Sequence, residues 1–309
     1  MLGIRKKHIT GFVLLLGVVR WYNLTLIAAS QYLLFWLAFS GHELGRVLYD
    51  FKLHCIVVAS LFSVAAAFII NAFYDVDKDL VNKPKQVLMG KLLKEGSLLN
   101  LYVVLNFLAV AFAMMASMRV MVFFVGYTVF CWFHSHKLQK LPVLREVSAS
   151  LLTMIPLLAI WFHFGHWHWG MFYYMGSLAI LLFTREVVKD MAGHKGNLIF
   201  GYKTVVVAAG VRRTRWGLVA MNTGFLIMYV VLNWIQVVDP VLPNWRPDYY
   251  LVISGVSLFT GFWVSWGMFF IRDDRKIPVM DAFLKLGIVV HLLSIVMQER
   301  WFLVARGGK

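Results

Sequence analysis

The sequence predicts an all-α, polytopic membrane protein with nine transmembrane helices. Hydrophobic residues make up 61% of the 309 residues and charged residues only 15%, whereas soluble chains have about 45–50% apolar and about 25% charged residues. The apolar residues are gathered into nine runs of about 20 residues, which is the length of helix that crosses a bilayer. This composition excludes a disordered chain and a soluble enzyme.

Polar residues separate the nine runs. Lys and Arg precede the first, fifth and seventh runs, acids follow the second, mixed charges follow the sixth, and a basic cluster separates the eighth from the ninth. Only Ser117-Met118-Arg119 marks the junction of the third and fourth, which predicts a tight hairpin. We expect one membrane-embedded domain over residues 1–309. The predicted spans are residues 21–40, 54–73, 99–117, 118–134, 145–165, 169–188, 216–238, 250–271 and 279–298.

The basic residues predict the orientation. With the N-terminus inside, 22 of the 30 Lys and Arg residues fall in loops on the inner side and 7 on the outer side, while one lies within the last span. Cytoplasmic loops of membrane proteins are enriched in Lys and Arg. The net charge of +15 therefore indicates membrane topology and no nucleic-acid partner. We expect the N-terminus and three large basic loops to be cytoplasmic.

An acidic stripe follows the second span. Asn71, Asp75 and Asp79 are spaced four apart, so they share one face of a helix, while Asp77 points elsewhere. Two carboxylates about 4–5 Å apart repel by roughly 1 kcal/mol in water and by several times that in a low-dielectric site. Mg²⁺ offsets such repulsion, and it is usually bound by one or two carboxylates plus substrate phosphates. The stripe predicts a Mg²⁺ site; the alternative is a solvated loop helix.

A second polar group ends the sixth span. Glu186 and Asp190 share a helix face, Lys189 lies on the adjacent face, and Lys203 follows in a basic loop. One acidic loop and one Lys-rich loop suit a metal-bridged diphosphate, because metals neutralise some phosphate oxygens and Lys or Arg donate to the others. For Lys189 and Lys203, a purely topological role remains the alternative.

These segments resemble a known family. Asn71 to Pro84 resembles the NDxxDxxxD signature of the UbiA superfamily of membrane prenyltransferases. Arg185 to Gly210 resembles the second motif region of that family, and Arg20-Trp21-Tyr22-Asn23 resembles its opening Arg-x-x-Asn. The resemblance covers nearly the whole chain. It implies a nine-helix bundle with motif loops after the second and sixth spans, both cytoplasmic.

The resemblance also implies the chemistry. A polyprenyl diphosphate enters from the lipid bilayer, binds through Mg²⁺, loses its diphosphate and transfers its prenyl group to a membrane-associated acceptor. The implied catalytic and metal-binding residues are Asp75, Asp79 and Asp190. The candidate substrate-binding residues are Arg20, Asn23, Asn71, Glu186, Lys189 and Lys203. For Asn23, an amide that serves helix packing is the alternative.

Within the family, two segments narrow the expectation. Residues 82–91 and 100–102 look most like a bacterial branch described as geranylgeranylglycerol-phosphate geranylgeranyltransferase-like. This similarity implies a geranylgeranyl donor, a lipid-type acceptor and a place in the bacterial cytoplasmic membrane. Quinone-pathway enzymes, which use aromatic acceptors, share the same motifs, so both acceptor classes stay open.

The sequence departs from the family pattern at several positions. Ala72 stands where an Asp is usual, although Asp75 and Asp79 remain. Gly193 and Asn197 stand where the second motif usually carries Asp, so this loop has lost two negative charges and a weaker second metal site is expected. After the fourth span, His134 stands where the family often has a Tyr, and Gln139 stands where it often has a Lys.

Two other classes of function remain open. The departures at Gly193 and Asn197 are compatible with a catalytically silent relative, which Mg²⁺-dependent diphosphate release would distinguish from an enzyme. A secondary transporter would carry ionisable groups near the bilayer midplane. The acids here lie at one face of the membrane, and no inverted repeat is evident. Ion-gradient-dependent uptake would favour this class.

The remaining polar residues have structural interpretations. Asp281 and Lys285 are four apart in the last span and are expected to neutralise each other. Cys55 and Cys131 lie in apolar runs and predict no disulfide. We expect His163, His166 and His168 to lie at the outer membrane–water interface. Several Trp residues stand next to them, as in an interfacial aromatic belt.

Overall fold

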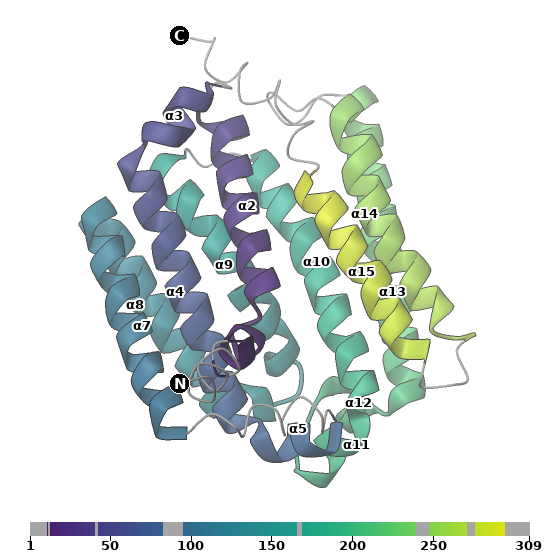
Figure 1. The fold of residues 1–309 in the computed structure, drawn as a ribbon. Coiled ribbons are helices and arrows are strands. Elements are labelled where there is room, and N and C mark those ends of the chain that lie inside the picture. The colour runs from purple at the N-terminus through teal and green to yellow at the C-terminus, as the bar shows by residue number, and fades with distance from the viewer. Residues whose placement is uncertain are drawn as a thin grey trace.

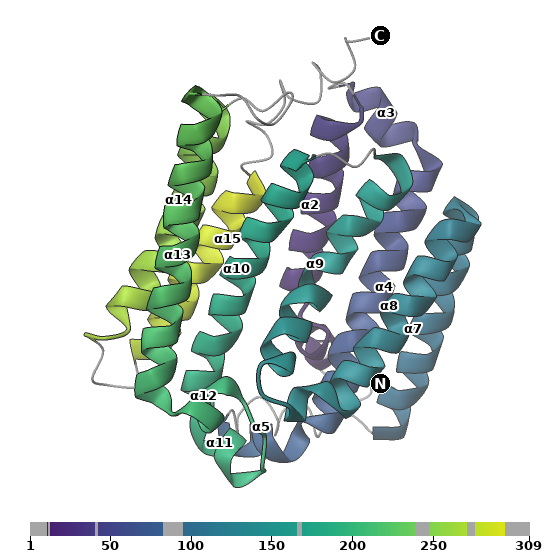
Figure 2. The same cartoon turned by 180° about the vertical axis from the view of Figure 1, so that it is seen from behind.

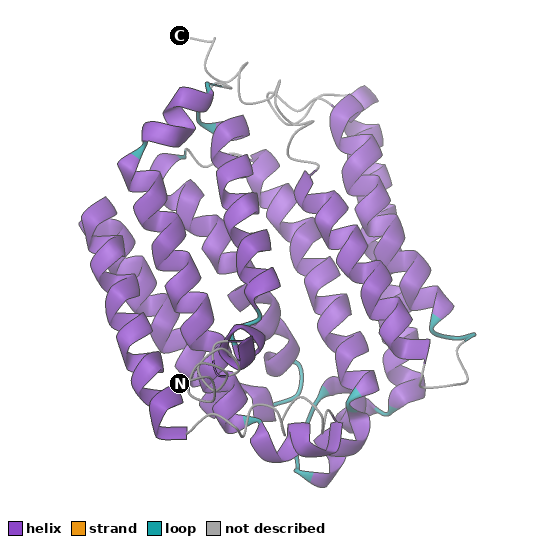
Figure 3. Ribbon diagram, viewed as in Figure 1, coloured by secondary structure: helices purple, strands orange, loops and turns teal. Residues whose placement is uncertain are grey.

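The computed structural model describes residues 11–293, apart from residues 12, 41–42, 83–94, 166–168, 239–246 and 271–275. The described residues form α-helices and connecting turns, without a β-strand (Figure 3). The long helices are α2 (Trp21–Ala38), α4 (Phe51–Tyr74), α7 (Glu95–Ala116), α8 (Met118–His136), α9 (Leu144–Phe164), α10 (Trp169–Ala192), α13 (Val211–Val238), α14 (Pro247–Gly267) and α15 (Ile277–Leu293).

A long helix lies at each of the nine predicted spans within the described part of the chain. The ends agree to within a few residues, because a continuous apolar run defines the segment that must be shielded from water. Residues 294–298 of the last predicted span lie outside the described residues. Among the described residues, five segments are long and apolar enough to cross a bilayer, namely Phe51–Tyr74, Gly96–Ala116, Met118–Lys140, Leu144–Phe164 and Val211–Ile235.

The long helices form a single bundle (Figures 1 and 2). α4 packs against α7, α8 and α2 on one side, and α10 packs against α15, α9 and α14 on the other, with α13 against α14. Many large side chains on the outside are apolar and exposed, including Phe107, Val122 and Trp234. Such faces would be a liability in water, but they are the expected surface towards lipid.

Short helices connect the long ones at the two ends of the bundle. α3 (Leu44–Tyr49) lies at one end. The opposite end carries α5 (Val76–Asn82), α11 (His194–Ile199) and α12 (Val205–Ala209), together with the turn around Leu138–Lys140 (Figures 1 and 2). The acidic segment after α4 and the mixed segment after α10 therefore meet at the same end. Which side of a membrane this end faces stays a prediction.

α9 contains a proline whose lost backbone bond is replaced from outside the helix. Pro156 has no N–H, so the carbonyl of Leu152 has no donor within α9. The Tyr127 hydroxyl of α8 donates to that carbonyl at 3.0 Å. The side chain of Gln31 donates to the Pro156 carbonyl at 2.6 Å and to Ser60 Oγ at 2.8 Å. These bonds tie α9 to α8, α2 and α4 inside an apolar bundle.

A similar polar contact holds the other half of the bundle. The buried amide of Asn222 on α13 donates to Thr184 Oγ1 on α10 and to Ser265 Oγ on α14, both at 3.0 Å. A Cβ added at Gly261 would lie 2.5 Å from Asn222 Oδ1, so only glycine lets α14 approach this closely. The contact fixes α10, whose last turns carry the second charged group.

Candidate active site

The first motif surrounds a turn of the chain. α4 ends at Tyr74 and α5 begins at Val76, so the acidic stripe does not lie on one uninterrupted helix. The backbone N–H of Asp75 still donates to Asn71 O at 3.0 Å, and that of Asp79 donates to Asp75 O at 2.8 Å. The three stripe residues therefore remain one turn apart.

Asp75 is buried and has three side-chain partners. Its carboxylate accepts from the Asn71 amide at 3.1 Å and from the Tyr202 hydroxyl at 3.2 Å, and it forms an ion pair with Lys78 Nζ at 2.7 Å. Asp79 is half-buried, whereas Asp77 is exposed. The structure thus separates Asp77 from the buried acid, in the direction that the spacing predicts.

Tyr202 joins the two motif segments. It lies in the loop between α11 and α12, and its hydroxyl contacts Asp75 and the carbonyl of Tyr74, which are far away in sequence. Its ring lies 4.5 Å from Lys78 Nζ, in cation–π geometry. Burial, followed by the negative charge of Asp75, raises the pKa of Tyr202. Sequence reasoning missed Tyr202, although an aromatic hydroxyl in a basic polar loop was the available signal.

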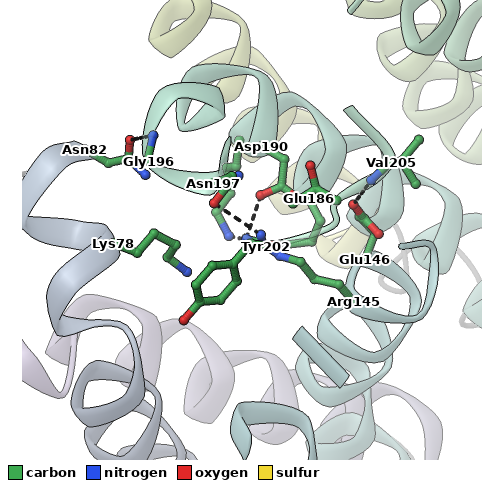
Figure 4. A network of polar contacts seen from close by, with 12 residues as sticks. Lys78, Asn82, Arg145, Glu146, Glu186, Asp190, Gly196, Asn197, Tyr202 and Val205 are labelled. Atoms are coloured by element: carbon green, nitrogen blue, oxygen red, sulfur yellow. Dashed lines mark hydrogen bonds and ion pairs between the residues drawn. The ribbon is translucent and has the colours of Figure 1, made fainter. Parts of the chain in front are cut away.

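A second ion pair, between Arg145 and Asp190, lies near Lys78 and Tyr202 (Figure 4). Arg145, in the first turn of α9, places Nη2 2.6 Å from Asp190 Oδ1 on α10, and its Nη1 lies 3.5 Å from Asn197 Oδ1. The neighbouring Glu146 is fully buried and accepts from the backbone N–H of Val205 at 2.8 Å. One carboxylate oxygen of Asp190 and one of Glu146 are buried without a hydrogen-bond partner.

Sequence reasoning did not single out Arg145 or Glu146. Arg145 counts among the basic residues that set the topology, because it stands at the start of an apolar run. Glu146 lies within the predicted span 145–165, and an ionisable residue inside a span is by default a functional candidate. That signal was available for Glu146. Nothing in the local spacing indicates that Arg145 reaches Asp190.

The third group of charges runs from α10 to α15. Lys189 Nζ lies 2.6 Å from Glu186 Oε2, and Arg185 lies 3.6 Å from Glu186 Oε1. Arg185 Nε also lies 2.9 Å from Asp281 Oδ1, while Lys285 Nζ lies 2.6 Å from Asp281 Oδ2. The expected intrahelical pair of Asp281 and Lys285 is present, with Arg185 as an additional partner. Glu186 and its face-mate Asp190 have different cations.

α5 and α11 are joined through a close backbone approach. Asn82 Oδ1 accepts from the backbone N–H of Gly196 at 3.0 Å. A Cβ added at Gly196 would lie 2.5 Å from Asn82 Nδ2, and one at Gly193 would lie 3.1 Å from the same atom. Glycine at these positions therefore lets the two motif helices meet.

Other predicted site residues lie around this cluster. The Arg20 guanidinium lies 5.0 Å from the Phe68 ring centre. Asn23 is half-buried on α2, and Lys203 is exposed. The structure brings neither of these two side chains into a direct polar contact with the motif acids among the described residues.

Of the remaining predicted positions, two join helices and one makes a local bond. His134 Nδ1 contacts Ser148 Oγ at 2.7 Å, which joins α8 to α9. Gln139 is buried and donates to the carbonyl of Ser135. His163 contacts Ser117 Oγ at 3.3 Å, which places it at the α7–α8 junction. Predictions for two other histidines lie outside the described residues, at His166 and His168.

The two motifs differ in how well they fit Mg²⁺. Asp75 and Asp79 offer two carboxylates one turn apart, and Mg²⁺ is commonly held by one or two carboxylates plus substrate phosphates. Asp190 is paired with Arg145, Glu186 with Lys189, and Asp75 with Lys78. Across the described ranges, no group of three or more His, Cys, Asp or Glu side chains converges to hold a metal. The first motif differs in Asp79, for which the described residues show no ion pair, so Asp75 and Asp79 are the residues that would hold a Mg²⁺ ion. Both acids of the second motif are paired with cations.

The fold and the site together define an integral membrane protein with a buried charge cluster at one end of a helical bundle. Residues 25–287 match the model of the UbiA prenyltransferase family. The chain therefore belongs to this family, as its motifs predict.

Similar sequences include two digeranylgeranylglyceryl phosphate synthases. The chain is 25% identical to that of Pyrococcus abyssi over 181 residues, which is 57% of this chain and 65% of that protein. The match thus spans just under two thirds of that relative. This chain is also 25% identical to the synthase of Methanospirillum hungatei over 255 residues, which is 79% of this chain and 84% of that protein.

Solved structures share the fold. A UbiA homologue from Archaeoglobus fulgidus, bound to GPP and Mg²⁺, superposes with a TM-score of 0.66 at 14% identity, covering 91% of this chain and 99% of that one. A structure of digeranylgeranylglyceryl phosphate synthase gives a TM-score of 0.66 at 15% identity over 93% and 98% of the two chains. At such identities the likeness establishes the fold alone.

Proposed function

We propose that the protein is a Mg²⁺-dependent membrane prenyltransferase, which moves a polyprenyl group, geranylgeranyl in the favoured case, from its diphosphate to an acceptor. The observation that carries this proposal is the contact between the two motifs. The 3.2 Å bond from Tyr202 to Asp75 brings the acids of the first motif beside the cations of the second. Family membership and the names of the relatives support the same reaction class.

The proposed reaction breaks the bond between C1 of the prenyl chain and the bridging oxygen of the diphosphate. The electron pair leaves with the diphosphate, and the allylic cation at C1 accepts a pair from the nucleophile of the acceptor, whose proton passes to the released diphosphate. Mg²⁺ held by Asp75 and Asp79 would neutralise phosphate oxygens and so improve the leaving group. Lys78 places positive charge beside Asp75, and Arg145 and Lys189 place it beside Asp190 and Glu186 of the second motif.

For the acceptor, we favour a lipid-type glycerol phosphate. The relatives are named digeranylgeranylglyceryl phosphate synthases, and an acceptor of that kind would reach the site from the membrane. An aromatic acceptor is the alternative, because the motifs are shared with enzymes of that class.

We also propose the membrane arrangement. All nine long helices span the bilayer, residues 1–309 act as one domain, and the end with the motifs faces the cytoplasm. The excess of Lys and Arg in the loops at this end supports that side. We propose the cytoplasmic membrane of a bacterium as the location.

The test is a prenyl-transfer assay on protein purified in detergent or nanodiscs. Geranylgeranyl and farnesyl diphosphates are each incubated with prenylated glycerol phosphates and with phenolic acids, and mass spectrometry identifies the product. We expect a glycerol phosphate product that requires Mg²⁺ and disappears with EDTA. Diphosphate release without any transfer product, or no Mg²⁺-dependent turnover with either donor, would contradict the proposal.

A catalytically silent relative is the second candidate. The observation that favours it is the pairing of the motif acids with protein cations, Asp75 with Lys78 and Asp190 with Arg145. Such pairs neutralise the charge that would otherwise attract Mg²⁺. A silent relative would bind prenyl diphosphate without releasing diphosphate, so binding and release measured on the same preparation separate the two candidates.

A further inference from the structure

An arginine from α9 contacts the second motif where the family resemblance implies negative charge. Of the positions at which the family resemblance implies acids, Asn197 and Gly193 carry none, and the remaining Asp190 is buried. Arg145 contacts both Asp190, at 2.6 Å, and Asn197, at 3.5 Å. The guanidinium of Arg145 therefore contacts both Asp190 and Asn197.

This pairing removes the attraction for a second divalent cation. A metal ion placed at Asp190 would meet a carboxylate whose charge Arg145 already balances, together with the like charge of the guanidinium itself. Nearby, Glu186 is balanced by Lys189 in the same way. No excess of negative charge remains at the second motif.

Arg145 is placed to act on a substrate phosphate instead. Arg145 lies beside Tyr202, whose hydroxyl contacts Asp75, so it is close to the place where the two motifs meet. A guanidinium has five N–H donors in a planar fork, which matches phosphate oxygens. Two of its nitrogens face Asp190 and Asn197, and the other donors remain for a ligand. Figure 4 shows these side chains gathered beside Tyr202 and Lys78.

The backbone at Arg145 is held in place through its neighbour Glu146. The adjacent Glu146 is fully buried and holds the backbone N–H of Val205, at the start of α12. The first turn of α9 is thus attached to the loop that follows the second motif. Asp190 contacts Arg145 through Oδ1, and its other carboxylate oxygen is buried without a hydrogen-bond partner.

We propose that Arg145 takes the place of a second metal ion: one divalent cation binds at the first motif, and the guanidinium of Arg145, oriented by Asp190 and Asn197, binds the diphosphate of the substrate. The proposal rests on the proposed function, since it requires a prenyl diphosphate. It explains how a second motif that has lost two acids still serves the same substrate.

The test counts metal ions by equilibrium binding. Wild-type protein is titrated with Mn²⁺, followed by electron paramagnetic resonance, with and without geranylgeranyl thiolodiphosphate, a donor analogue that reacts poorly. We expect one Mn²⁺ per chain in the presence of the analogue. Two Mn²⁺ ions per chain with normal analogue binding would overturn this inference and leave the proposed function intact. No Mn²⁺-dependent analogue binding at all would overturn the proposed function, and this inference with it.

Variants test the role of the guanidinium. Arg145→Gln should weaken analogue binding at least tenfold at fixed Mn²⁺, and Arg145→Lys should weaken it less. The matched control is Arg213→Gln, at an exposed arginine of α13, which should bind like wild type. Since Arg145→Gln leaves a buried Asp190 unpaired, Arg145→Gln/Asp190→Asn provides a neutral version that should also lose affinity. Unchanged analogue binding in a folded Arg145 variant would overturn the inference.

A converse variant restores the acid. Asn197→Asp combined with Arg145→Gln gives the second motif two carboxylates without their cation. We expect this protein to bind a second Mn²⁺ in the presence of the analogue. A count that stays at one would mean that Arg145 is not what excludes the second ion. Gly193 is left unchanged because a Cβ there would lie 3.1 Å from Asn82 Nδ2.

Discussion

Asp75 is bonded by side chains from three separate segments. Asn71 lies on α4, Lys78 on α5 and Tyr202 in the loop before α12. Burying a carboxylate costs several kcal/mol, and removing one partner from a buried pair costs about 3–5 kcal/mol. The surrounding donors offset this cost and hold the carboxylate in one position. Fixed positioning is what a group needs when it must meet a substrate in the same geometry at every turnover.

The first prediction concerns the acids of the first motif. Asp75→Asn and Asp79→Asn should each lower turnover by roughly 100-fold or more, as the loss of a preorganised electrostatic group does in other enzymes. The matched control is Asp77→Asn, because Asp77 is exposed, and surface changes usually stay within about 0.5 kcal/mol, or roughly twofold. Initial rates of prenyl transfer give the comparison, and thermal unfolding confirms that each variant is folded. Equal activity of all three variants would remove this stripe from the site.

The second prediction isolates the Tyr202 hydroxyl. Tyr202→Phe keeps the ring beside Lys78 but deletes the bond to Asp75. A lost hydrogen bond of about 1 kcal/mol corresponds to a roughly fivefold lower rate. Since burial and Asp75 raise the pKa of Tyr202, the hydroxyl stays protonated as the pH rises towards 10. The ratio of wild-type to Tyr202→Phe rates should therefore be the same at neutral and at alkaline pH. A ratio that collapses to one at alkaline pH would show that the hydroxyl ionises there.

At the scale of residues, the sequence shows the acids better than their partners. The spacing of Asn71, Asp75 and Asp79 is local, so a helical turn brings them together wherever the helix lies. The bond from Arg145 to Asp190 joins α9 to α10, and it depends on how two helices pack. Local spacing carries no information on such packing, which is why the cations of the site emerge only from the structure.

Among the elements, the helices were the most predictable part. Each long apolar run becomes a helix because an unpaired backbone group in lipid is costly. The differences lie at the charged ends. α4 breaks at Asp75, and α10 continues to Ala192, beyond the predicted end at residue 188, while its charged last turns are paired with Arg145 and Asp281. A hydropathy pattern does not register such pairs.

The third prediction tests the junction of α5 and α11. In Gly196→Ala the new Cβ would lie 2.5 Å from Asn82 Nδ2, so the Asn82 side chain must shift and lose its bond, or the two helices must separate. Overpacking of this kind costs about 1–3 kcal/mol, and transfer activity should fall because the motifs lose their alignment. Melting temperature and initial rate are measured together. The control is Gly217→Ala on α13, where a Cβ meets nothing within 4 Å.

A double variant shows whether the clash is the cause. Asn82→Ala removes the side chain that the new methyl group would meet, at the cost of the bond to the Gly196 N–H. Asn82→Ala/Gly196→Ala should therefore be less destabilised than the sum of the two single variants. Strict additivity would mean that Gly196 matters for another reason than its approach to Asn82.

At the scale of the whole molecule, the bundle separates two ends with different chemistry. The motif end carries the buried ion pairs of Asp75, Asp190 and Glu186. The other end carries α3, with an exposed pair between Arg46 and Glu43. The asymmetry of Lys and Arg predicts which end faces the cytoplasm, but a fold without its membrane does not test it.

The fourth prediction tests this orientation. Cys55 and Cys131 are buried and free, so both are replaced by serine or alanine to give a cysteine-free background. Single cysteines are then introduced at exposed positions, Leu198→Cys at the motif end and Tyr49→Cys on α3. A membrane-impermeant maleimide should label the Tyr49→Cys protein in intact cells. It should label the Leu198→Cys protein only in inverted vesicles. The reverse pattern would invert the proposed topology.

The proline of α9 has a consequence for biogenesis. The carbonyl of Leu152 obtains its donor from Tyr127 on α8, the helix synthesised just before α9. If α9 left the insertion machinery alone, that carbonyl would face hydrocarbon without a partner, at a cost of several kcal/mol. We therefore expect α8 and α9 to enter the bilayer as a pair. In that case α8 stays at the translocon until α9 has been synthesised. Tyr127 then supplies the hydrogen bond that α9 needs during insertion. Replacing Tyr127 by Phe should therefore increase the degradation of newly made protein.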